Sequence, residues 1–313
     1  MTSPLCIVCG VGSDRISAQR CRNCGFTYFG GTDEARDEFD YETAYDGDSD
    51  YHALAPSAVL RHYSHAPNTS WALDRLATRN SDRPTTLVEF GASQGAFVRL
   101  CVDMGIDSIG YELASESLRY GREQLDLGDR IRHGAWRSRH DDERRVDVAC
   151  AFETLEHLVD PIERLREIAT WPVPRGWVIL SVPNDRRLAV RLRRRETEDY
   201  PPHHLGRWTT RSIAIALRRA GLRPLEISVS PLNRSEILGV VAPGVAARRA
   251  AELGSFRPVA SQVADHQSSP VPSIARRAYP AMSAVGAPIA QVMNLIPELG
   301  SRLLVLAEVA TDD

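Results

Sequence analysis

The fold of this chain is decided by the stretch Leu87-Val88-Glu89-Phe90-Gly91-Ala92-Ser93-Gln94-Gly95-Ala96-Phe97. Its first part is an apolar strand that ends next to an acid, and its second part is a glycine loop that opens a helix. Glycine lets the backbone approach a ligand closely, and the first turn of a helix offers unpaired N–H groups. The stretch therefore predicts a ligand site at the carboxyl end of a buried strand.

The acid before the first glycine narrows the choice of ligand. A carboxylate at Glu89 repels a pyrophosphate and disfavours a dinucleotide, whereas it suits a cationic ligand that carries an amino group. S-adenosylmethionine (SAM) is such a ligand, and here the chain resembles the class I SAM-dependent methyltransferases. The usual motif of that family is E-x-G-x-G-x-G, and this chain has Ser93 at the middle glycine position.

Strand and helix patterns alternate after this stretch begins, which indicates a parallel sheet. The resemblance implies an α/β, Rossmann-like fold with the seven-stranded sheet of class I methyltransferases. We expect helices over 57–65 and 69–79, then after Gly95, from Ser115, after Asp160 and over 209–220. We expect strands over 86–90, 108–112, 130–133, 146–152, 177–182, 225–229 and 303–309.

The chain divides into four parts. Residues 1–32 are expected to form a zinc ribbon, 33–83 a linker with two helices, and 84–231 plus 301–313 the SAM-binding core. About seventy residues separate the last two strands, which is too long for a simple loop. We expect residues 232–300 to form a partly flexible helical cap, with helical patterns at 248–253 and 287–295.

The resemblance also implies which residues contact the cofactor. Glu112 ends the second strand, about twenty residues past the glycine loop, where a carboxylate can accept both ribose hydroxyls. Methyltransferases often place an acid for the adenine amine after the third strand, and this chain has Ala135 there, followed by Trp136, whose ring either stacks on adenine or belongs to the core. The expected cofactor-binding residues are Glu89, Gly91, Ala92, Ser93, Gly95, Glu112, Leu113, Ala135, Trp136 and Phe152.

The sequence Phe152-Glu153-Thr154-Leu155-Glu156-His157-Leu158 follows the fourth strand. It matches a signature of the methyltransferase branch that includes the ubiquinone-type O-methyltransferases. In a helical turn, positions i, i+3 and i+4 share a face, so Glu153, Glu156 and His157 would converge. Pro202-His203-His204-Leu205 comes after the fifth strand, as in the same branch.

Two catalytic roles are open for these residues, and a structural role is a third alternative. The small-RNA 3′-end 2′-O-methyltransferases resemble this arrangement, and by that resemblance Glu153, Glu156, His157 and His204 (or His203) would bind Mg²⁺ or a similar ion. Such an ion would lower the pKa of an acceptor hydroxyl. Alternatively, His157 caps a helix and His204 alone is the general base.

Six arginines lie just before the two histidines. Together they could hold a phosphate or diphosphate group of the acceptor, although such runs usually form a solvated helix face. They are Arg186, Arg187, Arg191, Arg193, Arg194 and Arg195.

Four of the six cysteines form two C-x-x-C pairs, Cys6 with Cys9 and Cys21 with Cys24. Eleven residues separate the pairs, and a glycine follows each pair. Four thiolates suit a tetrahedral, closed Zn²⁺ site, so we expect a structural zinc ribbon. A ribbon that binds nucleic acid or a partner through Arg15, Arg20 and Arg22 is the alternative.

Composition limits the partners. The chain has 313 residues with 41 acids and 38 bases, so no global charge attracts it to nucleic acid or membranes. No apolar run reaches the ~18 residues of a membrane-spanning helix, and the first residues do not form a signal peptide. A cytoplasmic protein is expected; the oligomeric state is open.

These patterns together predict a SAM-dependent methyltransferase. A ribbon ahead of such a core is typical of bacterial methyltransferases of sugar, polysaccharide and natural-product pathways. Sugar C-methyltransferases usually carry another C-terminal domain, so we expect O-methylation of a small-molecule or glycan acceptor. Alternatives are C- or N-methylation, RNA methylation, or a non-catalytic SAM-binding scaffold.

Overall fold

The structure is a computed structural model of the 313-residue chain. It describes residues 5–11, 16–17, 20–29, 54–79, 83–140, 143–192, 200–201, 203–232, 237 and 294–310.

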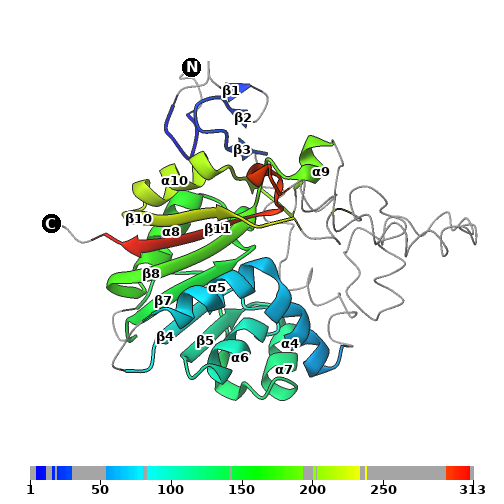
Figure 1. The fold of residues 1–313 in the computed structure, drawn as a ribbon. Coiled ribbons are helices and arrows are strands. Elements are labelled where there is room, and N and C mark those ends of the chain that lie inside the picture. The colour runs from blue at the N-terminus through cyan, green and yellow to red at the C-terminus, as the bar shows by residue number, and fades with distance from the viewer. Residues whose placement is uncertain are drawn as a thin grey trace, which may run out of the picture.

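A seven-stranded sheet forms the centre of the molecule, in the order β10-β11-β8-β7-β4-β5-β6 (Figure 1). β4 pairs in parallel with β5 and β7, and β11 is antiparallel to both β8 and β10. This arrangement confirms the predicted fold class. The strands are β4 (Thr86–Phe90), β5 (Asp107–Glu112), β6 (Ile131–His133), β7 (Val146–Phe152), β8 (Pro172–Pro183), β10 (Leu222–Val229) and β11 (Arg302–Val309).

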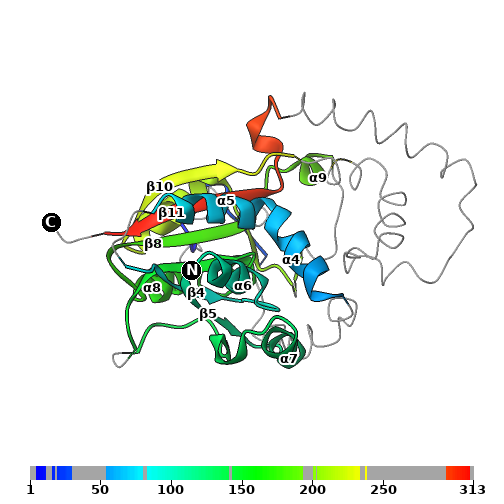
Figure 2. The ribbon, with the colours of Figure 1, turned by 60° about the horizontal axis from the view of Figure 1, so that its bottom comes forward.

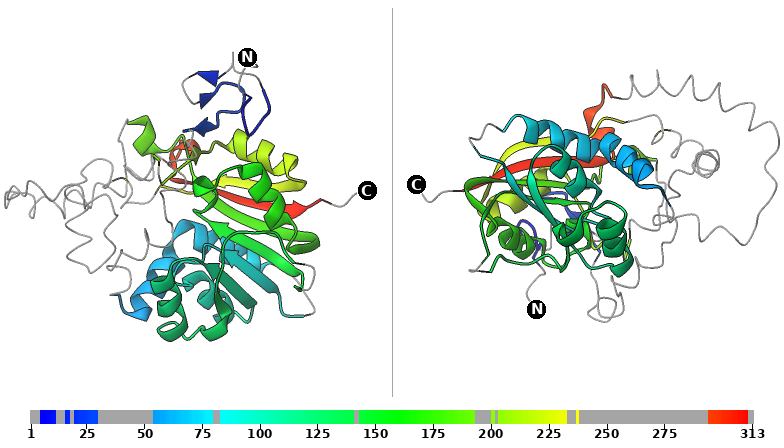
Figure 3. Two further views of the ribbon diagram at one scale, coloured as in Figure 1. Left: turned by 180° about the vertical axis from the view of Figure 1, so that it is seen from behind. Right: turned by 90° about the horizontal axis from the view of Figure 1, so that it is seen from below.

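Helices cover both faces of this sheet (Figures 2 and 3). One face carries α4 (Pro56–His65), α5 (Pro67–Ala77) and α6 (Ala96–Asp103), with α7 (Ser115–Glu123) beside them, and the other carries α8 (Pro161–Ala169) and α10 (Thr210–Arg219). Shorter elements are η2 (Gly128–Arg130), η3 (Leu155–His157), α9 (Leu188–Arg191) and η6 (Pro297–Leu299).

The buried strands explain the continuous apolar runs in the sequence. Along β4, Val88 and Phe90 pack towards α8 and α10, whereas Leu87 packs towards α5 and α6. A parallel strand that is covered on both faces cannot alternate apolar and polar residues. All five residues of β4 are therefore buried, including Glu89.

Most element ends lie where the local signals predict them. Asp160 accepts a hydrogen bond from the Glu163 N–H at the start of α8, and Thr209 and Ser212 form a capping box at the start of α10. Gly105 and Gly221 follow α6 and α10 with φ of 77° and 79°. β8 begins at Pro172, five residues before its predicted start.

Three short strands near the N-terminus form a second sheet: β1 (Ile16–Ser17), β2 (Arg20–Cys21) and β3 (Thr27–Tyr28). The sequence did not predict its fourth strand, β9 (Gly206–Arg207), which comes from the methyltransferase-like part of the chain and pairs with β3. Figure 1 shows this ribbon above α10 and beside α9.

Other predictions concern residues that the structure does not describe. The acidic linker at 33–50 and the helical pattern at 248–253 lie outside the described residues, and of the pattern at 287–295 only Asn294 and Leu295 are described, in a turn. Among the described helices, none has the length and apolar character that crossing a bilayer requires.

Asp147 joins the amino ends of two central strands. It is 4% exposed and accepts hydrogen bonds from the Thr86 N–H (2.9 Å) and from Arg83 (2.8 Å). Burial acts to raise the pKa of Asp147, but the hydrogen bonds from Thr86 and Arg83 outweigh it and hold the pKa below its usual value.

We expect Asp147→Asn to lower the free energy of unfolding at pH 7 by about 1.5–3 kcal/mol, the scale of charge-assisted hydrogen bonds. A depressed carboxylate pKa stabilises the fold above the unfolded pKa, and this stabilisation disappears as the pH falls. Urea unfolding should therefore show a smaller difference between variant and wild type at pH 3 than at pH 7. Asp107→Asn, at an exposed ion pair with Arg130, is the control and should change stability by less than about 0.5 kcal/mol.

Candidate active site

The glycine loop has the backbone geometry that its sequence predicts. Gly91 and Gly95 have φ of 68° and 78°, and α6 begins directly after Gly95. A Cβ on Gly91 would lie 2.6 Å from the Thr154 Oγ1 atom, and one on Gly95 would lie 2.4 Å from the Leu127 Cδ1 atom. Both positions therefore exclude a side chain. Ser93 also has a left-handed φ, 48°, at the position where the family motif has glycine.

Glu89 provides a buried acid beside this loop. It lies in β4, is 4% exposed, and its Oε2 atom has no hydrogen-bond partner among the described residues. Burial, and then the nearby Glu112 carboxylate, raise the pKa of Glu89 well above its usual value. A buried acid with an unpaired oxygen fits a ligand ammonium group, which would pair with the ionised form.

Glu112 holds the loop in place. Its Oε2 atom accepts a hydrogen bond from the Ser93 N–H at 2.6 Å, and its Oε1 atom accepts from the N–H groups of Leu113 (2.8 Å) and Ala114 (3.0 Å). A carboxylate has about four acceptor positions, so capacity remains for a ribose hydroxyl. Glu112 thus has a role in loop structure that the sequence did not predict.

Tyr63 is a residue of this site that the sequence analysis missed. It lies on α4, burial raises the pKa of its hydroxyl, and the Ser93 side chain of the glycine loop is close enough to act in the opposite direction. Glu89 and Glu112 are close enough to raise that pKa further. The sequence pattern offered only an amphipathic helix here, and nothing in it pointed to the glycine loop.

The residues expected around the adenine lie in different environments. Ala135 is exposed, and Phe152 packs edge-on against Phe97, with ring centroids 4.8 Å apart. Trp136 is buried in the core on the α8 side, where its Nε1–H donates to the Arg164 carbonyl at 2.7 Å. The core interpretation of Trp136 therefore replaces the stacking interpretation, because its ring packs against Phe90.

Three of the expected catalytic residues come together beside the loop. Ligand atoms of Glu156, His157 and His204 all lie within 4.8 Å of one another. The imidazole rings of His157 and His204 are 4.8 Å apart and almost perpendicular, and the His204 Nε2 atom is 4.0 Å from the Glu156 Oε1 atom. We call this group the Glu156–His157–His204 cluster.

Glu153 lies outside this cluster, so the expected convergence of four side chains is corrected to three. It has φ of 49°, which is not helical, and η3 begins only at Leu155. The i, i+3 argument therefore does not apply. The Glu153 Oε1 atom accepts from the Ser181 hydroxyl at 2.7 Å, and its Oε2 atom is 3.4 Å from the Arg302 Nε atom.

The protonation states in the cluster follow from burial. Glu156 is 1% exposed, neither carboxyl oxygen has a hydrogen-bond partner among the described residues, and burial, with Glu153 nearby, raises its pKa well above the usual value. Burial, and then His204, lower the pKa of His157 to about 3. Burial also lowers the pKa of His203.

The tautomer of His157 is set by His203. The His157 Nδ1 atom is 2.8 Å from the His203 carbonyl oxygen, and since a carbonyl only accepts, Nδ1 donates. The other ring nitrogen, Nε2, then carries a lone pair. This hydrogen bond is the arrangement that orients metal-binding histidines, and it also suits a neutral base.

Two of the arginines that precede the histidines form ion pairs with one glutamate. Arg186 and Arg191 form ion pairs with Glu298 at 2.9 and 2.8 Å. Arg187 is 6% exposed and donates to the Asn184 carbonyl. Arg193, Arg194 and Arg195 lie outside the described residues.

The four ribbon cysteines are arranged for a tetrahedral ion. The Sγ atoms of Cys6 and Cys24 are 3.7 Å apart, and those of Cys9 and Cys21 are 3.6 Å apart. Zn–S bonds of about 2.3 Å give an S–S separation of about 3.8 Å in a tetrahedron. A hydrogen bond from Cys24 lowers the pKa of Cys6 to about 5. The thiols therefore fit Zn²⁺, and all six cysteines of the chain are free rather than disulfide-bonded.

The chain belongs to the methyltransferase-domain family, which matches residues 61–227, more than half of the sequence. It is a SAM-dependent methyltransferase with the class I fold. This match does not extend to the ubiquinone-type branch that the Glu153–His157 motif resembles. No curated protein matches the chain in sequence.

Solved structures share this fold at low identity. The chain is similar to a chain from the complex between the Haloferax volcanii Trm112 methyltransferase activator and a proposed methyltransferase (17% identity, 87% of this chain, 99% of that chain, TM-score 0.52). It is also similar to a proposed sarcosine dimethylglycine methyltransferase from Galdieria sulphuraria (16%, 77% and 84%, 0.49). A third is the geranyl diphosphate C-methyltransferase from Streptomyces coelicolor (16%, 77% and 78%, 0.47).

We expect SAM binding to release a proton from Glu89, because burial favours the protonated acid whereas the ligand ammonium group favours the ionised form. SAM affinity should therefore rise between pH 5 and pH 7, by at most about tenfold per pH unit. Titration calorimetry in phosphate and in Tris, which differ in ionisation enthalpy, measures the proton directly. Glu89→Gln should bind weakly and without this pH dependence, whereas Asp103→Asn, at an exposed pair with Arg99, should behave like the wild type.

We expect the purified chain to contain about one zinc ion, from the count of four thiolates. Elemental analysis should show that Cys21→Ser loses most of the metal, while Cys101→Ala, in the buried core, keeps it. S-adenosylhomocysteine affinity should be nearly the same in Cys21→Ser, because the glycine loop is built from other residues. Full zinc content in Cys21→Ser would refute the four-cysteine site.

Proposed function

We propose that this enzyme transfers the methyl group of SAM to a hydroxyl of a small-molecule or glycan acceptor, such as a sugar, a polysaccharide or a secondary metabolite. The observation that carries the proposal is the Glu156–His157–His204 cluster at the carboxyl edge of the sheet. The cluster adjoins the glycine loop, since Thr154, just before η3, lies against Gly91. Simple SAM binding would need no such group.

The cofactor would bind along the edge formed by β4 and β5. Glu89 would pair with its amino group, and Glu112 would accept a ribose hydroxyl while it holds the loop. Tyr63 would cover the loop from α4. Backbone contacts would come from the rest of the predicted set: Gly91, Ala92, Ser93, Gly95, Leu113, Ala135 and Phe152.

The chemistry requires an in-line displacement. Bound SAM supplies an electrophilic sulfonium methyl group, so positioning the acceptor provides much of the rate. The chain must also remove the proton of the acceptor hydroxyl. The His204 imidazole would accept this proton, and the Glu156 carboxylate, 4.0 Å from its Nε2 atom, would stabilise the imidazolium that results.

The same three residues also fit a divalent cation. The Glu156 oxygens are unpartnered among the described residues, and the His157 Nδ1 hydrogen bond to the His203 carbonyl is of the kind that orients metal-binding histidines. One carboxylate and two imidazoles suit Mn²⁺, Fe²⁺ or Zn²⁺ better than Mg²⁺, which prefers more oxygen ligands. When bound, such an ion would lower the pKa of a coordinated hydroxyl.

The test is release of S-adenosylhomocysteine from SAM with a panel of catechols, phenols and monosaccharides. We expect His204→Ala to reduce turnover by the ~10²–10⁴-fold typical of a general base. If a cation participates, EDTA should stop turnover, Mn²⁺ or Zn²⁺ should restore it, and Glu156→Gln should be about as damaging as His204→Ala. If His204 acts alone, EDTA should have little effect.

Glu153→Gln is the matched control, since Glu153 lies in the same motif but outside the cluster. It should reduce turnover much less than Glu156→Gln does. Wild-type turnover by both His157→Ala and His204→Ala would contradict both versions of the mechanism. Product analysis by NMR separates O-methylation from the C- and N-methylation alternatives.

A further inference from the structure

The ribbon contacts the segment that carries His204. β3 pairs with β9, with Tyr28 opposite Gly206 and Thr27 opposite Arg207. The Phe29 N–H extends this pairing by donating to the Leu205 carbonyl at 3.1 Å. The ribbon backbone thus reaches to within one residue of His204.

The same segment is bonded on its other side to the candidate acceptor site. The Leu205 N–H donates to the Glu156 carbonyl at 2.8 Å, and the His203 carbonyl accepts from the His157 Nδ1–H at 2.8 Å. Residues 203–207 therefore connect the ribbon to η3. Within the segment the only regular element is the two-residue β9, whose partner is β3.

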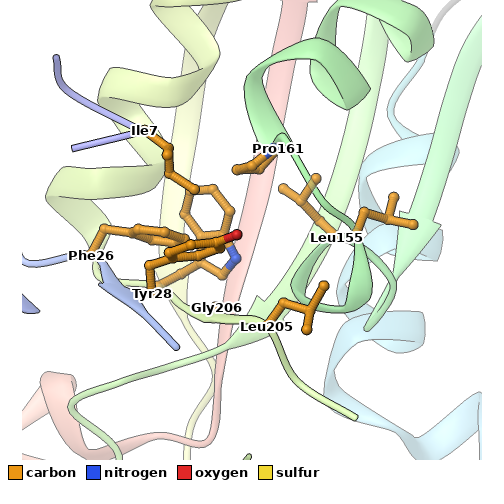
Figure 4. A pocket seen from close by; sticks show the side chains of 9 residues that line it. Ile7, Phe26, Tyr28, Leu155, Pro161, Leu205 and Gly206 are labelled. Carbon is orange, nitrogen blue, oxygen red and sulfur yellow. The ribbon is translucent and has the colours of Figure 1, made fainter. Parts of the chain in front are cut away.

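Apolar side chains pack along this junction (Figure 4). Phe26 of the ribbon lies 4.6 Å from Trp208 between ring centroids, and a Cβ on Gly206 would lie 2.5 Å from the Phe26 Cζ atom. The crevice that remains between the two sides is too narrow to hold a water molecule. Its lining comprises Ile7, Phe26 and Tyr28 from the ribbon, and Leu155, Leu158, Pro161, Leu205, Gly206 and Trp208 from the core.

Polar contacts also hold the ribbon against the core on both sides of this junction. Asp185 is 5% exposed, accepts from the Thr27 hydroxyl at 3.4 Å and lies 3.4 and 3.5 Å from nitrogens of Arg20 and Arg207. The Thr209 hydroxyl donates to the Cys24 carbonyl at 2.9 Å, next to the second knuckle. Buried contacts of this kind specify one docking position.

We propose that the ribbon is a positioning element of the acceptor site, which holds His203–Trp208 against η3 and so sets the geometry of the Glu156–His157–His204 cluster. The inference rests on the proposed function only for the role of that cluster. The structural coupling between the ribbon and the His204 segment concerns residues 26–29, 155–158 and 203–208. Catalytic groups must be held to within about 0.5 Å, and the short segment lacks regular structure that could do this alone. Phe26 and Gly206 are the positioning residues in this arrangement.

Phe26→Ala tests the coupling without altering a cysteine or a cluster residue. Amide hydrogen exchange of the full chain should become at least about tenfold faster in peptides that contain Leu205 and Glu156–Leu158, because the packing that opposes local opening is lost. Peptides from β4 and the glycine loop should exchange as in the wild type. S-adenosylhomocysteine affinity should change by less than about twofold, because the glycine loop is built from other residues.

A second readout reports on the histidines themselves. Diethyl pyrocarbonate should modify His157 and His204 faster in Phe26→Ala, as mapped by mass spectrometry, while His133, exposed at the end of β6, should react at the same rate. Gly206→Ala, which wedges the junction from the core side, should reproduce both effects, and Phe26→Leu should largely restore the wild-type behaviour. Arg22→Ala, at an exposed ribbon position, is the matched control without effect.

Unchanged exchange at Leu205 and Glu156–Leu158 in both Phe26→Ala and Gly206→Ala would overturn the proposal. Faster exchange throughout the sheet would also overturn it, by showing that the ribbon supports overall stability instead. These outcomes are separate from the proposed function. That function fails if the wild type does not bind S-adenosylhomocysteine or if both His157→Ala and His204→Ala turn over acceptors normally, whatever the exchange results.

Discussion

Parallel pairing of β4 with β5 and β7 is the constraint on which the site depends. The register places Glu89 opposite Gly110 and Cys150, so the strand ends that carry the glycine loop, Glu112 and the Glu153–His157 motif meet at one edge of the sheet. In open α/β sheets this carboxyl edge is where ligands bind. A Cβ on Gly110 would lie 2.7 Å from the Ala92 Cβ atom, so the close approach of loop and strand requires glycine there as well.

Burial of acids at this edge gives the site its chemistry. Glu89 and Glu156 are both almost fully buried, and both have raised pKa values because desolvation disfavours the charged form. Such groups ionise when a cation arrives, which in the first case would be the ammonium group of SAM and in the second a metal ion or an imidazolium. The desolvation free energy of these two carboxyl groups is thus offset only when a cation binds beside them. Such an arrangement is common for functional residues with perturbed pKa values.

The ribbon changes how the acceptor side of the enzyme is viewed. From the sequence, the four-cysteine ribbon is expected to be a separate stabilising module. In the structure, however, the ribbon strand β3 is the partner of β9, and the ribbon aromatic side chains lie beside Leu155 and Leu205. If the proposed sites are right, the cofactor side is built from contacts within the core, whereas the acceptor side depends on a surface that the ribbon completes. Cofactor binding and acceptor geometry would then be supported by different parts of the chain.

The sequence alone determined the sheet, most of its helix ends and the residues of the glycine loop, because these follow from local apolar runs, caps and glycines. It also identified the four cysteines by their spacing, and the Glu156, His157 and His204 side chains by their resemblance to motifs of other methyltransferases. The tertiary structure alone decided that Glu153 turns towards Ser181 and Arg302, that Trp136 belongs to the core and that Tyr63 lies near Ser93, Glu89 and Glu112. It also decided that β3 pairs with β9. Each of these outcomes depends on a contact between residues far apart in the chain, or on a backbone torsion at one residue, and neither leaves a periodic pattern in the sequence.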